Sequence, residues 1–162
     1  MKISRQEKTL QGLTLFEALL YLALFSIIFV VVIEIMSTID QSNNTAKYRA
    51  EIDRNIIFVA EHIKESFRTS ESINSTDTGM ILLDLADAGY YQYTDSGSTL
   101  YFDNDGIETL PITTSKVAIG TFGVQDVENK DGDVVGVRVL FDISSARDPN
   151  IFKDTEMTFM VP

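Results

Sequence analysis

Apolar residues fill one long stretch near the start of the chain. No charged residue occurs from Ala18 to Ile33. A helix over residues 13–39 would be about 40 Å long at ~1.5 Å per residue, which is more than the ~30 Å hydrocarbon thickness of a bilayer. The pattern therefore predicts a single transmembrane helix over residues 13–39, preceded by a short basic stretch, residues 1–12.

An amphipathic helical stripe follows the apolar stretch. Residues 40–70 contain no Pro or Gly, and their apolar positions recur three or four residues apart: Ile52, Ile56, Val59, Ala60, Ile63 and Phe67. Charged residues occupy the opposite helical face. Such a stripe is typical of a helix that packs one face on a domain. We therefore expect residues 40–70 to continue the helix, with the polar patch Asp40–Thr45 as its weakest stretch.

The composition changes after Ser70, where short β-favouring runs alternate with polar segments. The predicted strands are Met80–Leu83, Ala88–Tyr93, Thr99–Phe102, Lys116–Ile119, Gly120–Val124, Val134–Phe141 and Glu156–Val161. Asp103–Gly106 and Asp131–Asp133 are turn signals between them. Val134–Phe141 alternates only loosely, which favours an inner strand. The chain is thus predicted to be α+β, with a long N-terminal helix packed on one C-terminal antiparallel β-sheet head, residues 71–162.

Charge is distributed unevenly along the chain. The net charge is −11, and residues 71–162 carry sixteen acidic and five basic residues. An acidic head argues against binding to nucleic acid. Basic residues before the span and an acidic domain after it predict that the N-terminus stays in the cytoplasm and the head crosses the membrane. There is no cysteine, which excludes disulfides and thiol chemistry.

One acidic residue, Glu17, stands at the start of the apolar stretch. On insertion scales a charge in mid-bilayer costs roughly 2.5–3.5 kcal/mol, and somewhat less near the end of a span. An acidic residue in a membrane span is therefore a functional candidate, and it requires a positive partner.

The segment Gly12-Leu13-Thr14-Leu15-Phe16-Glu17 resembles the processing motif of type IV prepilins and of the pseudopilins of type II secretion systems. In that family a membrane peptidase cuts after the Gly, the new N-terminal residue is N-methylated, and the fifth mature residue is Glu. The resemblance implies that residues 1–12 are a basic leader peptide, which is removed by cleavage between Gly12 and Leu13. It also implies methylation of Leu13 and a role for Glu17 in assembly. It also implies a pilin-like fold.

The resemblance further implies where the protein acts and with which partners. The expected partners are other pilin or pseudopilin subunits, a prepilin peptidase, an inner-membrane assembly platform and membrane lipid. The expected location is the cytoplasmic membrane, as a single-pass protein, and later a pilus or the cell surface. Leu13 replaces the usual Phe, and Glu34 stands where major pilins often carry Pro. With the absent cysteines, these departures favour a minor pilin or pseudopilin.

Two other functional classes compete with this interpretation. An uncleaved single-pass membrane protein could use its head as an extracytoplasmic binding or sensing domain. An enzyme is not expected, because His62 is the only histidine and no catalytic constellation can be assembled around it. His62 is expected at the surface or boundary of the helix. The mature N-terminus separates the first two classes.

Metal binding has one weak candidate. Asp103, Asp105 and Glu108 place oxygens at nearly alternate positions, as at the start of a calcium loop. The twelfth position of such a loop would be Thr114, which is not the bidentate Glu that an EF-hand requires. A hairpin turn with an acidic tip is the favoured interpretation, and no cofactor is expected. The cluster Tyr90, Tyr91 and Tyr93 is expected to pack in a strand and not to form an adhesive surface.

Overall fold

The computed structural model describes the backbone of residues 6–75 and 79–160, and the side chains of residues 14–73 and 79–160. The chain divides into two compact units, Met1–Asn44 and Thr45–Pro162. We call them the N-terminal unit and the head unit. One long helix, α1 (Gln6–Thr69), contributes its first part to the N-terminal unit and its second part to the head unit.

The N-terminal unit exposes its apolar side chains. From Leu15 to Ile39 the large hydrophobic residues of α1 are 45% to 67% exposed. Hydroxyl side chains turn back to the helix, since Ser26 and Thr38 donate hydrogen bonds to the carbonyl oxygens four residues earlier, at 2.8 and 2.9 Å. Such back-bonding satisfies polar groups without a partner outside the helix.

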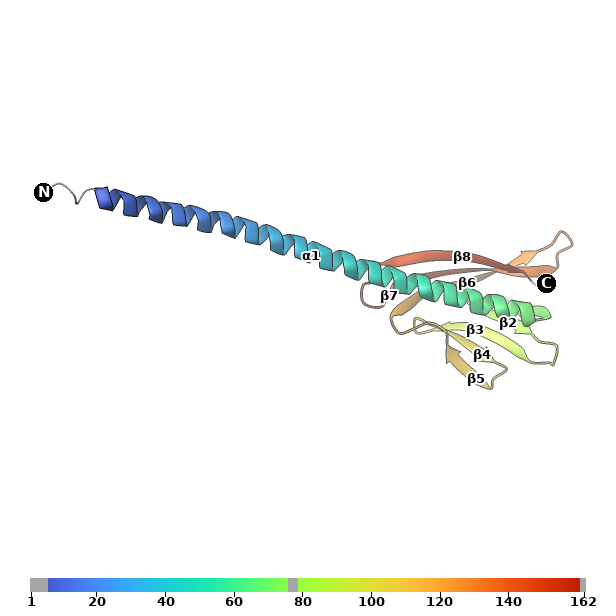
Figure 1. The fold of residues 1–162 in the computed structure, drawn as a ribbon. Coiled ribbons are helices and arrows are strands. Elements are labelled where there is room, and N and C mark those ends of the chain that lie inside the picture. Colours follow the sequence, from blue (N-terminus) through green and yellow to red (C-terminus); the bar gives the residue numbers. More distant parts are fainter. Residues whose placement is uncertain (1–5, 76–78, 161–162) are drawn as a thin grey trace. The chain divides into compact units, whose positions relative to one another are not determined.

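The described part of the head unit joins the second part of α1 to two antiparallel sheets (Figure 1). Sheet A has the order β1-β2-β3-β4-β5, and sheet B has the order β6-β7-β8. The strands are β1 (Ser72–Ser75), β2 (Met80–Asp84), β3 (Tyr90–Ser96), β4 (Thr99–Asn104), β5 (Glu108–Pro111), β6 (Val117–Glu128), β7 (Val134–Ser145) and β8 (Phe152–Met160). The predicted α+β class is confirmed. β7 is the central strand of sheet B, as its sequence pattern predicts.

The apolar stripe of α1 forms the centre of the head core. Its members Ile52, Ile56, Val59, Ile63 and Phe67 are at most 8% exposed, as the helical spacing predicts. Both sheets contact this part of α1. The ring of Phe67 stacks on Phe159 of β8 at 5.5 Å, and the ring of His62 meets Phe102 of β4 at 4.6 Å. The helix therefore contributes to a single core that both sheets complete.

The arrangement of the strands differs from the sequence-based prediction in three ways. Two sheets replace the single predicted sheet. The two short strands predicted around Gly120 form one strand, β6, whose register against β7 shifts between Ile119 and Phe122. The outer strands β1 and β5 were not predicted, because both are short and polar and every residue of β5 is exposed.

Candidate functional site

Glu17 lies on the exposed surface of α1 in the N-terminal unit. The hydroxyl of Tyr21, one helical turn later, donates a hydrogen bond to its Oε1 at 3.2 Å. Among the residues that the structure describes, no Lys or Arg forms an ion pair with Glu17. The carboxylate is therefore available to a cation from outside the described part of the chain.

The surface around Glu17 is suited to lipid. The helix from Thr14 onward is long and apolar enough to cross a membrane, and none of its most apolar window is buried within the protein. Phe25 and Phe29 stack on one another at 6.2 Å between ring centres while both stay exposed. An apolar helix surface of this kind is compatible with the interior of a bilayer or with neighbouring apolar helices.

The predicted processing residues Gly12 and Leu13 lie within α1, but their side chains are outside the described residues. The separation between the predicted cleavage site and Glu17 is therefore taken from the sequence, in which Glu17 is the fifth residue after Gly12. In a helix that spacing is slightly more than one turn. Sequence reasoning missed Tyr21, although its spacing of four residues from Glu17 was a usable signal.

The calcium candidates belong to the β4–β5 hairpin, which confirms the predicted turn. Asp103 uses both carboxylate oxygens locally: Oδ1 accepts from the backbone N–H of Gly106 at 2.7 Å, and Oδ2 accepts from the Thr109 hydroxyl at 2.9 Å. Asp105 has a positive φ of 53° in the turn, and Glu108 is exposed at the start of β5. Within the described residues no three His, Cys, Asp or Glu side chains gather in a way that could hold a metal ion.

A polar network inside the head unit was not predicted. His62, on α1, is half-buried, and its Nδ1 lies 2.8 Å from the hydroxyl of Tyr93 on β3. The Ser66 hydroxyl lies 2.6 Å from the same oxygen. In one consistent assignment Ser66 donates to Tyr93, which donates to neutral His62. This network joins α1 to sheet A, and Tyr93 lies 27 and 31 residues along the chain from Ser66 and His62, so no local pattern indicates it.

Burial sets the acid–base properties of this network. Desolvation lowers the pKa of His62, because the charged imidazolium loses water. Desolvation also raises the pKa of Tyr93 well above its usual value. Both groups are therefore held neutral near neutral pH. Tyr93 is fully buried, and Tyr90 and Tyr91 are half-buried, which confirms that the tyrosine cluster packs.

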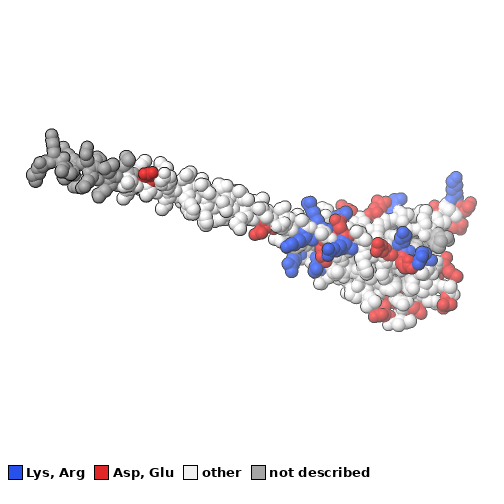
Figure 2. Space-filling view, viewed as in Figure 1, with Lys and Arg blue, Asp and Glu red and all other residues white. Residues whose placement is uncertain are grey.

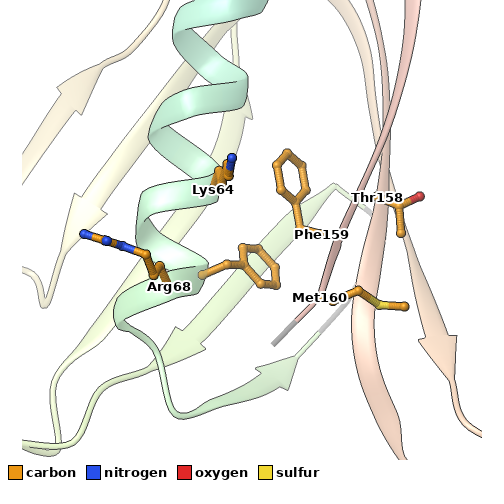
Figure 3. Close-up of a pocket in the computed structure, with 6 residues that line it drawn as sticks. Lys64, Arg68, Thr158, Phe159 and Met160 are labelled. Carbon is orange, nitrogen blue, oxygen red and sulfur yellow. The ribbon is translucent and has the colours of Figure 1, made fainter. Parts of the chain in front are cut away.

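A shallow cavity of about 300 Å³ lies where the end of α1 meets β8 (Figure 3). Lys64 and Arg68 of α1 lie on one side, and Thr158 to Met160 of β8 lie on the other. The guanidinium of Arg68 is already paired with Glu65 at 2.7 Å. The described residues that line this cavity include no His, Asp, Glu or Cys.

Comparisons with protein-family models, with curated proteins and with solved structures found no match for this chain.

Proposed function

We propose that this protein is a prepilin-like structural subunit, a minor pilin or pseudopilin that assembles into a short fibre through its N-terminal helix. Support comes from the conjunction of two features. The motif from Gly12 to Glu17 opens the apolar stretch, and the same helix continues into an α+β head. The strongest single observation for the proposal is the carboxylate of Glu17, which is followed by an uncharged stretch of helix from Ala18 to Ile33.

Cleavage after Gly12 would give the acid a partner that the encoded chain lacks. The new α-amine at Leu13 would have a reference pKa of about 7.7–8.0, so a large share of it is cationic near neutral pH. Within one mature subunit the amine and Glu17 are separated by one helical turn. Between subunits with an axial offset, the amine of one chain can reach Glu17 of its neighbour.

This pairing provides a driving force and a register for assembly. An unpaired charge in an apolar helix bundle costs several kcal/mol, whereas a pair of opposite charges offsets much of that cost. Only an axial offset that brings the two groups together would be stable. Tyr21 would hold the Glu17 side chain along the helix through its hydrogen bond.

In this proposal the subunit passes through two locations. It is first a single-pass protein of the cytoplasmic membrane with the head outside, where a prepilin peptidase cuts it. It then joins other pilin or pseudopilin subunits at an inner-membrane assembly platform and becomes part of a pilus. The head, which has its own core, needs no refolding during this transfer.

Processing is tested by co-expression with a prepilin peptidase, followed by mass spectrometry of the intact membrane protein. We expect a mature chain that starts at Leu13, and a heavier one if Leu13 is methylated. The Gly12→Val variant should keep the whole leader, because it removes the Gly after which the peptidase of this family cuts. A wild-type chain that keeps Met1 or Lys2 would contradict the proposal and favour the uncleaved membrane protein with a binding or sensing head.

A further inference from the structure

A basic pocket lies on the head unit beside the first turns of its part of α1. Its volume is about 350 Å³. Four of the side chains that line it are cationic and one is a carboxylate, which gives the lining a net charge of +3. The residues that line it are Lys47, Tyr48, Ala50, Glu51, Arg54, Lys116, Ser145 and Arg147. Such a lining is suited to an acidic partner.

Three segments distant in sequence build this pocket, and hydrogen bonds hold them together. The backbone N–H of Ala146, after β7, donates to the carbonyl of Lys116, before β6, at 2.9 Å. The side-chain oxygen of buried Asn55 of α1 accepts from the N–H of Thr114 at 3.0 Å. The loops that carry Lys116 and Arg147 are thereby held against α1, so the pocket is preformed.

Most of the positive charge in the pocket is uncompensated. Glu51 forms an ion pair with Lys116 at 3.3 Å. Among the described residues, no carboxylate pairs with Lys47, Arg54 or Arg147. Figure 2 shows Lys and Arg gathered over one part of the visible face of the head, whereas Asp and Glu predominate over the rest. The pocket therefore presents unpaired cations on a domain that is acidic elsewhere.

The turn that joins β6 to β7 has the opposite charge. This acidic turn, residues 126–133, carries four acids and one base, a net charge of −3. The side-chain oxygen of Asn129 orders it by accepting from the N–H of Asp131 at 2.8 Å. The carboxylates of Glu128 and Asp131 are exposed and have no ion-pair partner among the described residues. Its tip is open, because no atom lies within 4 Å of the position that a Cβ on Gly132 would take.

The basic pocket and the acidic turn lie at opposite ends of one strand pair. Val117 of β6 pairs with Ser145 of β7 at the pocket, and Glu128 pairs with Val134 at the acidic turn. Each strand has 12 residues, which span roughly 35–40 Å at ~3.3 Å per residue. The two features therefore cannot meet within one head, whereas two copies of the head can bring them together.

We propose that the basic pocket of one head binds the acidic turn of a second copy of this chain. Arg54 and Arg147 offer forked N–H donors that match carboxylate oxygens, and Glu128 and Asp131 supply those carboxylates. Because two different surfaces meet, the contact is heterologous and can repeat from one copy to the next. Its place in a fibre rests on the proposed function, whereas the contact itself rests on the head unit and requires no cleavage after Gly12.

Cross-linking of the full, uncleaved chain in detergent measures the contact. The chain has no cysteine, so Ala50→Cys in the pocket lining and Lys130→Cys in the acidic turn become its only thiols. The two positions are too distant for a disulfide within one head, since bridged Cα atoms lie about 4.4–6.8 Å apart. After mild oxidation we expect a ladder of dimers, trimers and larger species on a non-reducing gel. Salt added before oxidation should weaken the ladder, because it screens the charges.

Charge reversal at either end should remove the ladder from this double-cysteine chain. Arg54→Glu/Arg147→Glu alone, or Glu128→Lys/Asp131→Lys alone, should lower the cross-linked fraction at least about ten-fold, because like charges then face each other. All four changes in one chain restore opposite charges and should restore the ladder. This recovery separates a lost contact from a misfolded head.

Two matched controls reverse exposed charges elsewhere on the head and should keep the ladder. Lys64→Glu/Lys153→Glu changes two cations outside the pocket, and Asp87→Lys/Glu108→Lys changes two acids outside the acidic turn.

Three results would overturn the inference. A double-cysteine chain with wild-type charges that stays monomeric would leave the pocket to an acidic partner other than this chain. A ladder that survives reversal of either end would show that these charges do not form the contact. Dimers from the Ala50→Cys chain alone, without a ladder from the double-cysteine chain, would assign a two-fold contact between pockets. None of these results bears on processing at Gly12, which the mass of the mature chain tests separately.

Discussion

The two parts of α1 have the same secondary structure but opposite surroundings. In the N-terminal unit the large apolar side chains are 45% to 67% exposed, whereas the apolar stripe in the head unit is at most 8% exposed. The second part meets two sheets of its own chain. None of the most apolar window of the first part is buried by other described residues of the chain, and that part of the helix is long and apolar enough to cross a membrane.

Polar groups differ between the two parts in the same way. In the head unit the buried polar side chains have partners within the chain, as Asn55 and Tyr93 show. Thr155 Oγ1 is the exception among the described buried side chains. In the N-terminal unit Glu17 accepts a hydrogen bond from Tyr21, and no Lys or Arg among the described residues forms an ion pair with it. The head core therefore satisfies most of its polar groups within the chain, whereas the proposed function supplies a cation for Glu17 from another subunit.

The largest expected effect comes from comparing two isoleucine-to-alanine variants of α1, one in each unit. Ile63→Ala removes a fully buried side chain and should lower the free energy of unfolding of the head by about 2–5 kcal/mol. Ile27→Ala, in the exposed part of the same helix, should leave head stability unchanged. Chemical unfolding of the full chain in detergent, followed by near-ultraviolet circular dichroism of the tyrosines, measures both. Equal losses would contradict the separation of the two units.

Removing one hydroxyl from the polar network should have the next largest effect. Tyr93→Phe leaves Ser66 and His62 without their shared partner and should cost about 1–3 kcal/mol of the free energy of unfolding. The control Tyr101→Phe removes a hydroxyl from half-buried Tyr101 on β4, outside this network, and should change stability by less than about 0.5 kcal/mol. If the two variants unfold alike, the network does not stabilise the head.

The pH dependence of head stability should reflect His62. Its pKa is lower in the folded head than the reference value of about 6.5, so the unfolded chain binds the proton first. Stability should therefore fall as pH decreases below about 6.5, before most carboxylates titrate near pH 4. His62→Gln, which does not titrate, should flatten this part of the unfolding profile. A wild-type profile that is flat across this range would show that His62 does not contribute.

Surface ion pairs should matter least. Lys153 of β8 pairs with Asp53 of α1 at 2.7 Å, and both side chains are more than half exposed. Exposed pairs contribute about 0–1 kcal/mol because water and salt screen them. Lys153→Ala should therefore lower the melting temperature by little, measured by the same dichroism signal. A loss as large as that of Ile63→Ala would mean that the pair, and not the core, fixes β8 to α1.

The sequence pattern predicted the elements that bury side chains. The spacing of Ile56, Val59 and Ile63 revealed the packed face of α1, and the valine-rich run from Val134 revealed the inner strand. Elements that bury little left no such signal, as β5 shows. Ala88 was placed in a strand, but its φ of 62° puts it in the turn before β3. Turn geometry at that point depends on the hydrogen bond from Leu85 N–H to the Gly89 carbonyl.

Contacts between residues that are far apart in the sequence could not be predicted from the sequence pattern. His62 was expected at the helix boundary, and its half-buried position agrees with that expectation. The hydrogen bond between His62 and Tyr93 depends on the packing of sheet A on α1, which the sequence pattern does not show. A pocket on the head unit whose lining includes Lys47, Arg54, Lys116 and Arg147 likewise depends on two loops, which bring Lys116 and Arg147 together. Glu17 was identified from sequence because it breaks a local pattern, which is the kind of signal that needs no tertiary structure.

The most direct test of the central claim is the incorporation of Glu17→Val into fibres, measured by shearing fibres from cells and quantifying the subunit in fibre and membrane fractions. The matched control is Glu34→Val, which removes the other acid that α1 carries in or next to the apolar stretch. We predict that the Glu17→Val protein reaches the membrane at wild-type levels and is absent from fibres, whereas the Glu34→Val protein assembles. Normal incorporation of the Glu17→Val protein would contradict the account.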